Sequence, residues 1–286
     1  MTHLLSLADL SPGDLDAILA LAEDAPAPVL AGKGAALYFE KPSARTRNSM
    51  ELAVHQLGGH PVYLTPGELG IGTRESVEDI ARTLACFHGV ICARVFDHGL
   101  LEALAAASPV PVVNMLSGSD HPLQALADLL TIRQLCGGIE GVKVAYVGDG
   151  DNNVARSLAQ GCAMLGAALT IVAPEGYQLS DAPAGVAQTA DLAAVEGADI
   201  VYTDVWVSMG QDSEAERRNA DLHAYQVNDA LMARAPQAHF LHCLPARRGE
   251  EVTASVIDGP RSAVWRQAEN RMHSARGALM WLLQKD

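Results

Sequence analysis

The stretch AALYFEKPSARTRNSMELAVHQLGGHPVYL, from Ala35 to Leu64, decides the fold. Its apolar opening, Ala35–Glu40, predicts a buried strand, and Pro42 marks the end of that strand. Apolar residues then recur at helical spacing through Ser43–Leu57, which predicts a helix. His60–Leu64 predicts a second strand. The order strand, helix, strand indicates an α/β protein with a parallel sheet.

The same alternation continues along most of the chain. Further strands are predicted at Val90–Phe96, Val110–Leu116, Val142–Val147, Leu169–Ala173, Ile200–Val205 and His239–Leu244, and further helices at Val77–Phe87, Leu100–Ala107, His121–Leu135, Asn153–Leu165 and Ala263–Leu283. A break near Cys136–Gly141 divides the pattern into two runs. We therefore predict an α/β fold of two doubly wound domains, each with a parallel sheet flanked by helices. The first domain is expected at residues 1–130 and the second at 131–265, with a C-terminal helix at 266–286 that packs back on the first.

Composition and charge exclude several classes of protein. Of the 286 residues, 49% are hydrophobic and 19% are charged, and the net charge of −14 argues against a nucleic-acid or anionic-membrane surface. The five cysteines are odd in number and lack Cys-x-x-Cys spacing, so they suggest neither a disulfide framework nor a zinc module. The start of the chain lacks the basic and apolar regions of a signal peptide, and no apolar run is long enough to cross a bilayer. We therefore expect a cytoplasmic protein with no membrane or nucleic-acid partner.

A candidate anion site follows the first predicted strand. Ser43 is placed to cap the next helix, whose N-terminus offers free backbone N–H donors and a partial positive charge. Together with Arg45 and Thr46 it makes a pattern typical of a phosphate cradle. The alternative is a capped surface helix with solvated arginines, and the spacing alone does not separate the two.

Other polar groups fall where predicted strands end, which is where ligands bind in open α/β sheets. Arg94 lies near the end of one strand, and His121 and Gln124 share one face at the start of a helix. By itself, His121 is more simply interpreted as a helix-capping residue. Cys243 follows His242 at another strand end. Because neighbours on a strand point to opposite faces, His242 is not expected to activate the Cys243 thiol.

The segment Gly148–Asn153, GDGDNN, follows a predicted strand and precedes a predicted helix. It resembles a dinucleotide-binding loop only loosely, because Asn153 stands where the Gly-x-Gly-x-x-Gly pattern needs its third glycine. A nicotinamide site is therefore disfavoured, and the Asn153 amide is a candidate contact for a small polar ligand. The polar and charged segment Ser208–Asn219 is interpreted either as a functional loop or as a solvated insertion.

Six ordered segments together resemble the aspartate/ornithine carbamoyltransferase family. They are SARTR at 43–47, HPLQ at 121–124, GDGDNN at 148–153, DVWVSMG at 204–210, HCLPA at 242–246 and AENRMH at 268–273. SARTR, HPLQ and the ENR part of the last segment are similar to carbamoyl-phosphate elements shared across the family. DVWVSMG and HCLPA are specific to its ornithine branch.

The resemblance implies transfer of the carbamoyl group of carbamoyl phosphate to the δ-amine of L-ornithine, giving L-citrulline and phosphate, a step of arginine biosynthesis. It implies a homotrimer that needs no metal and no organic cofactor. Carbamoyl phosphate would be bound by Ser43, Ala44, Arg45, Thr46, Arg94, His121, Gln124, Cys243, Leu244 and Arg271. Of these, Arg94, His121, Cys243 and Arg271 would be catalytic, and L-ornithine would be bound by Asn153, Asp204, Ser208 and Met209.

Two positions depart from the family pattern and keep other functions open. Ala44 replaces the usual threonine, which removes one hydroxyl donor. Gly70 replaces the glutamine of a loop that reaches a neighbouring subunit in the family. One alternative is therefore a carbamoyltransferase for another amine, such as an acylated ornithine, putrescine or a specialised metabolite. A second is a weakly active paralogue that binds an amino acid, and a nicotinamide dehydrogenase is the third.

Overall fold

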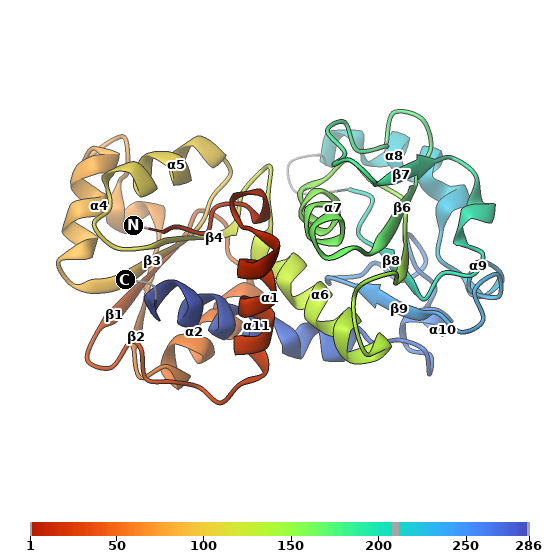
Figure 1. The fold of residues 1–286 in the computed structure, drawn as a ribbon. Helices are drawn as coiled ribbons and strands as arrows, with labels where there is room; N and C mark the ends of the chain where they lie inside the picture. Colours follow the sequence, from red (N-terminus) through yellow and green to blue (C-terminus); the bar gives the residue numbers. More distant parts are fainter. Residues whose placement is uncertain (1, 208–211, 285–286) are drawn as a thin grey trace. The chain divides into compact units, whose positions relative to one another are not determined.

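A computed structural model describes residues 2–207 and 212–284, and this part of the chain forms two compact units (Figure 1). Unit 1 combines the chain up to Ala127 with the segment from Glu269 onward, and unit 2 is the intervening segment Asp128–Ala268. The boundaries fall inside two helices, α6 (Pro122–Cys136) and α11 (Val264–Gln284), so each of these helices contributes residues to both units. None of the helices in the described ranges is both long and apolar enough to span a membrane.

Unit 1 is built on a parallel sheet with the strand order β2-β1-β3-β4. Its strands are β1 (Gly34–Phe39), β2 (His60–Leu64), β3 (His88–Arg94) and β4 (Val112–Leu116). After β1 the chain moves to one side to form β2, and it then returns to the other side to form β3. The order therefore reverses between β1 and β3, where Phe39 and Arg94 pair at the carboxyl ends of the two strands.

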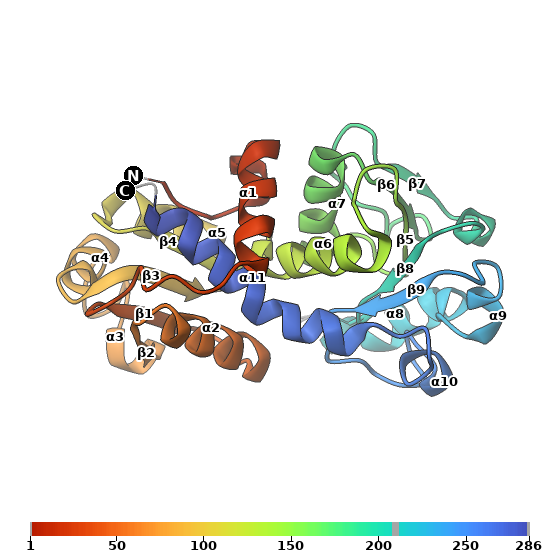
Figure 2. The same ribbon diagram turned by 60° about the horizontal axis from the view of Figure 1, so that its bottom comes forward.

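Helices cover both faces of the unit 1 sheet (Figures 1 and 2). They are η1 (Leu7–Asp9), α1 (Pro12–Glu23), α2 (Ala44–Gln56), α3 (Pro66–Leu69), α4 (Val77–Ala85) and α5 (His98–Ala107). Ala36 and Tyr38 of β1 share one hydrophobic cluster with Ile80 of α4 and Leu101 of α5. Leu37 points to the opposite face, on which α2 lies, and is fully buried there.

Unit 2 repeats this plan with the parallel strand order β7-β6-β5-β8-β9. Its strands are β5 (Lys143–Val147), β6 (Ala168–Val172), β7 (Ala187–Thr189), β8 (Ile200–Thr203) and β9 (His239–His242). Its helices are α7 (Asn153–Leu165), η2 (Leu192–Val195), η3 (Asp212–Glu214), α8 (Ala215–Leu222), η4 (His223–Tyr225), α9 (Asp229–Met232) and α10 (Ala254–Ile257). The strand order reverses between β5 and β8.

The C-terminal part of α11 packs against α1 within unit 1 (Figures 1 and 2). Arg276 donates hydrogen bonds to the backbone oxygens of Ala22 and Asp24, at 2.8 and 2.9 Å. Gly277 is required at the crossing, because a Cβ there would lie 2.5 Å from the backbone oxygen of Ile18. Backbone oxygens at the C-terminal end of α1 are therefore bound by a side chain, Arg276, from the other end of the sequence.

The predicted fold class, two doubly wound α/β domains, is confirmed, but several predicted elements are wrong in extent. β8 ends at Thr203 rather than Val205, because the side chain of Asp204 accepts the N–H of Val205 at 2.8 Å. β9 likewise ends at His242 rather than Leu244, whose N–H is bound by the His242 ring at 2.9 Å. The segment Ser208–Asn219 is not a loop throughout, since α8 begins at Ala215.

Candidate active site

The strand order of unit 1 reverses between β1 and β3, and in open α/β sheets ligands bind at the carboxyl ends of the strands at such a switch point. Ser43, which follows β1, is the N-cap of α2, as predicted: its Oγ accepts the N–H of Thr46 at 3.4 Å. The Ser43 hydroxyl also donates to Thr46 Oγ1 at 3.2 Å. Ala44 opens the helix and is exposed. The first turn of α2 thus presents backbone donors and two hydroxyl groups beside the end of β3.

Two buried guanidinium groups converge on the Thr46 hydroxyl. Arg94 Nη1, at the end of β3, lies 3.4 Å from Thr46 Oγ1, and Arg271 Nη2, on α11, lies at the same distance. Arg271 Nη1 also donates to Gln124 Oε1 at 2.6 Å and lies 3.2 Å from Nε2 of His121. Because a guanidinium can only donate, Nε2 of His121 accepts. Side chains from four separate parts of the sequence therefore form one cluster.

The electrostatics of this cluster favour an anion. Burial, together with the charges of Arg271 and Arg45, lowers the pKa of Arg94 to about 10. Burial and the charges of Arg271 and Arg94 also hold the pKa of His121 well below its usual 6.5, so its ring is neutral at pH 7. Cations crowded in this way repel one another until a negative group lies between them. Arg45, exposed in the first turn of α2, is close enough to Arg94 for its charge to contribute to the lowered pKa of Arg94.

The reversal in unit 2 places the segment Gly148–Asn153, after β5, beside Asp204, after β8. Asn152 is the N-cap of α7, and its side-chain oxygen accepts the N–H groups of Val154 and Ala155, each at 2.9 Å. Asn153 is therefore the first residue of the helix rather than its cap, and it is partly exposed.

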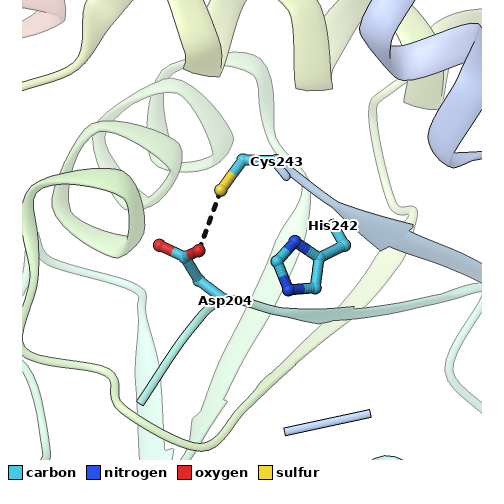
Figure 3. A group of neighbouring side chains, drawn as sticks. All are labelled: Asp204, His242 and Cys243. Atoms are coloured by element: carbon cyan, nitrogen blue, oxygen red, sulfur yellow. Dashed lines mark hydrogen bonds between the residues drawn. The ribbon is translucent and has the colours of Figure 1, made fainter. Parts of the chain in front are cut away.

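Asp204 and Cys243 meet at the ends of β8 and β9 (Figure 3). The Cys243 thiol donates to Asp204 Oδ1 at 2.9 Å, and the His242 ring points away from that contact. Both nitrogens of His242 have other partners: Nδ1 accepts the N–H of Leu244, so Nε2 carries the hydrogen and donates to Glu251 at 3.0 Å. The expectation that His242 does not activate Cys243 agrees with this geometry.

The two hydrogen bonds of His242 also bear on whether Asp204, His242 and Cys243 could bind a metal ion. Ligand atoms of Asp204, His242 and Cys243 lie within 4.8 Å of one another, a spacing that suits a metal ion. His242 is committed to the protein at both nitrogens, which leaves Asp204 and Cys243 as the two members that face each other. A metal ion bound by all three residues would therefore have to displace one hydrogen bond of His242. Leu244 follows in the left-handed conformation, with φ of +58°, a strain that is typical of functional sites.

The structure accounts locally for one of the two departures from the family pattern. Gly70 ends α3 with φ of +62°, a conformation that favours glycine. A Cβ at this position would lie 2.8 Å from Cβ of Arg74, whose guanidinium folds back onto the backbone oxygens of Glu68 and Leu69. For Ala44 the structure offers no comparable reason.

The predicted residues thus fall into two groups. Unit 1 holds Ser43, Ala44, Arg45, Thr46, Arg94, His121, Gln124 and Arg271, and unit 2 holds Asn153, Asp204, Cys243 and Leu244. Ser208 and Met209 lie outside the described residues. A buried ion pair between Arg218 and Asp149 in unit 2 was not predicted from the sequence. A signal for it existed, because Ala215, Arg218 and Leu222 share one helical face and Leu222 is apolar.

Family models match both halves of the chain. The model described as aspartate/ornithine carbamoyltransferase, carbamoyl-P binding domain, matches residues 2–134. The model described as aspartate/ornithine carbamoyltransferase, Asp/Orn binding domain, matches residues 140–283. The two matches together cover nearly the whole chain.

Individual relatives give the same result. The chain is 46% identical to the ornithine carbamoyltransferase of Bacillus subtilis over 300 residues, covering 99% of this chain and 94% of that protein. It is 51% identical to that of Hyperthermus butylicus over 272 residues, covering 90% and 86%. The solved structure of ornithine carbamoyltransferase from Pyrococcus furiosus superposes with a TM-score of 0.93 at 43% identity, covering 99% and 97%.

Proposed function

The chain belongs to the aspartate/ornithine carbamoyltransferase family, and from this premise we propose that it transfers the carbamoyl group of carbamoyl phosphate to the δ-amine of L-ornithine. The products are L-citrulline and phosphate. The observation that carries the proposal is the convergence of buried Arg94 and Arg271 on Thr46, at the switch point of unit 1. A compact set of guanidinium groups at a helix N-terminus suits a phosphate dianion.

Unit 1 is proposed to bind the donor. Ser43, Arg45, Thr46 and the backbone of Ala44 would hold the phosphate, and Arg94 would bridge phosphate and carbamoyl oxygen. His121, Gln124 and Arg271, which contact one another, would surround the carbamoyl group. As the carbonyl carbon becomes tetrahedral, charge develops on its oxygen and on the departing phosphate, and preorganised cationic donors stabilise that charge. The proposed roles of Cys243 and Leu244 toward the carbamoyl group remain predictions.

Unit 2 is proposed to bind the acceptor. The carboxylate of Asp204 is suited to the α-ammonium of an amino acid, and the Asn153 amide is suited to its α-carboxylate. Ser208 and Met209 are proposed to complete this site. The δ-amine resembles a lysine, whose pKa is near 10.4, so only about one molecule in 2,500 is neutral at pH 7. The site must therefore favour the neutral amine by desolvation and orientation.

The reaction balances without an additional reagent. The lone pair of the neutral δ-amine attacks the carbonyl carbon, forming a C–N bond, and the bond from that carbon to the phosphate oxygen breaks. The attacking nitrogen loses one proton, which leaves with the phosphate. Carbamoyl phosphate is a mixed anhydride that is already activated, so direct attack by the amine suffices.

The test is citrulline formation from ornithine and carbamoyl phosphate by purified protein. The assay runs beside a panel of amines containing N-acetylornithine, putrescine and lysine. We expect the highest kcat/KM with L-ornithine. Absence of citrulline from protein shown to be folded would overturn the proposal, and preference for another amine would reassign the acceptor.

We further propose a cytoplasmic homotrimer whose citrulline enters arginine biosynthesis. Support for a reducing compartment comes from the cysteines, all five of which are free thiols. Phe87 and Phe96 of unit 1 are 71% and 55% exposed, and burying these side chains in an assembly would remove apolar surface from water. Light scattering should give three times the chain mass of 30.1 kDa, and a monomer would refute the trimer.

A further inference from the structure

The switch point of unit 2 contains a buried guanidinium that the roles above do not use. Arg218, on α8, is 7% exposed. Its Nε donates to the backbone oxygen of Trp206 at 2.6 Å, and its Nη2 donates to the carboxylate of Asp149. Its Cζ also lies 5.0 Å from the ring centroid of Tyr177. One side chain therefore joins three segments that are far apart in the sequence.

Two of these segments carry the proposed acceptor residues. Asp149 belongs to the segment Gly148–Asn153, which follows β5. The last residue of this segment is Asn153, a proposed acceptor residue. Trp206 follows Asp204 by two residues, after β8. Because both segments lie beyond their strands, the parallel ladder between β5 and β8 does not fix them. The contacts of Arg218 are a direct link between them.

Arg218 also determines the charge at this switch point. Asp149 is 2% exposed, and burial raises its pKa to about 6, an effect that Arg218 opposes and the charge of Asp204 increases. The carboxylates of Asp149 and Asp204 are therefore close enough to interact electrostatically. With Asp149 neutralised by Arg218, the negative charge of Asp204 remains available to an ammonium group.

We propose that Arg218 is a positioning residue for the acceptor amino acid. It holds the Trp206 main chain, and with it Asp204, at a fixed place relative to the segment Gly148–Asn153, and it neutralises Asp149. This inference rests on the proposed function, because it takes the switch point of unit 2 as the amino-acid site. Arg218 acts through its neighbours and is not assigned a contact with substrate.

The first test compares two arginines that are adjacent on one helix. Arg218→Gln removes the buried contacts, and Arg217→Gln makes the same change at a side chain that is 63% exposed and paired with Glu214. We expect Arg218→Gln to raise the KM for ornithine about tenfold or more. The dissociation constant of inorganic phosphate, a ligand of unit 1, should change less than about twofold. Equal losses at both sites, or equal effects of the two variants, would overturn the proposal.

Two further variants separate the positioning effect from loss of stability. Arg218→Lys keeps the charge but loses the Nε donor to Trp206, so its KM for ornithine should lie between those of the wild type and Arg218→Gln. Adding Asp149→Asn to Arg218→Gln removes the unpaired buried carboxylate and should recover about threefold of the lost affinity. A double variant that binds ornithine no better than Arg218→Gln would contradict the charge role.

Failure of the proposed function can be told apart from failure of this inference. Citrulline formation by the wild-type protein tests the reaction alone. If ornithine is not the acceptor, the contact between Arg218 and Trp206 can still be tested by fluorescence. Trp206 is 1% exposed, and it is the sole tryptophan in a protein that carries Trp265→Phe and Trp281→Phe. In that background, Arg218→Gln should increase acrylamide quenching of Trp206, and Arg217→Gln should not. Unchanged quenching in Arg218→Gln would overturn the positioning role.

Discussion

Cys243 and Asp204 are joined by a hydrogen bond of 2.9 Å from the thiol to Oδ1, although 39 positions separate them in the sequence. The bond connects the end of β9 to the end of β8, the strand that borders the switch point of unit 2. It fixes the orientation of a carboxylate that we assign to the ammonium group of the acceptor. We predict that the thiol acts here as a hydrogen-bond donor and not as a nucleophile.

Replacing Cys243 tests that assignment. Cys243→Ala removes the donor and should lower kcat/KM for ornithine about tenfold or more, the scale of a hydrogen bond to a charged group. Cys243→Ser keeps a donor and should recover most of the loss. Cys86→Ala, at an exposed thiol, is the control and should behave as wild type. Full activity of Cys243→Ala in steady-state kinetics would refute the donor role.

Arg45 is predicted to act on the donor substrate. Arg45→Ala should lower kcat/KM for carbamoyl phosphate about 100-fold, the typical effect of removing one donor to developing charge. Arg47→Ala is the matched control on the same helix, because Arg47 points to Glu51 at 2.7 Å and stacks on Tyr63. It should change kcat/KM less than about twofold. An Arg45→Ala enzyme with wild-type kinetics would remove Arg45 from the phosphate site.

The neutral state of His121 predicts a dependence of stability on pH. The pKa of His121 is well below 6.5 in the folded protein and near 6.5 in the unfolded chain, so below pH 6.5 the unfolded chain binds more protons. The free energy of unfolding should therefore fall as the pH drops from 6.5. In His121→Gln this decline should be shallower by up to about 1.4 kcal/mol per pH unit. Urea unfolding at several pH values measures the difference, and parallel curves would show that His121 is not buried and neutral.

We predict that the contact between α11 and α1 contributes to the stability of the protein but not to its catalytic activity. Arg276→Ala removes hydrogen bonds to Ala22, Asp24 and Gln56 and should lower the free energy of unfolding of the protein by about 2–4 kcal/mol. Arg248→Ala breaks an exposed pair with Asp258 and should leave the melting temperature nearly unchanged. Citrulline formation at 25 °C should be normal in both variants. A raised KM or a lowered kcat in Arg276→Ala would place this side chain in the site after all.

The features that could be predicted from the sequence are local ones. Ser43 caps α2 because its hydroxyl reaches a backbone N–H three residues away, so the contact needs no knowledge of the fold. The strand and helix alternation also depends on short periods. Strand ends were less predictable, since the side chains of Asp204 and His242 take main-chain donors that a strand would otherwise use.

The contacts that make the site are distant in sequence and depend on strand order. Arg94 and Thr46 meet because β1 and β3 are neighbours, and spacing along the chain does not encode that pairing. Arg271 joins them from a position 225 residues beyond Thr46, and only the resemblance to the family linked it to the others. Arg218 was missed because its segment is rich in charge, which is normally typical of a solvated surface.

The discontinuous make-up of unit 1 has a consequence for biosynthesis. Thr46 leaves the ribosome 225 residues before Arg271, a delay of roughly 10 to 45 seconds at ordinary translation rates. Unit 2, which is continuous in sequence, is complete before α11 can close unit 1. A nascent chain therefore gains the complete cluster that we propose for phosphate only after the whole of unit 2, the proposed amino-acid half, has been synthesised.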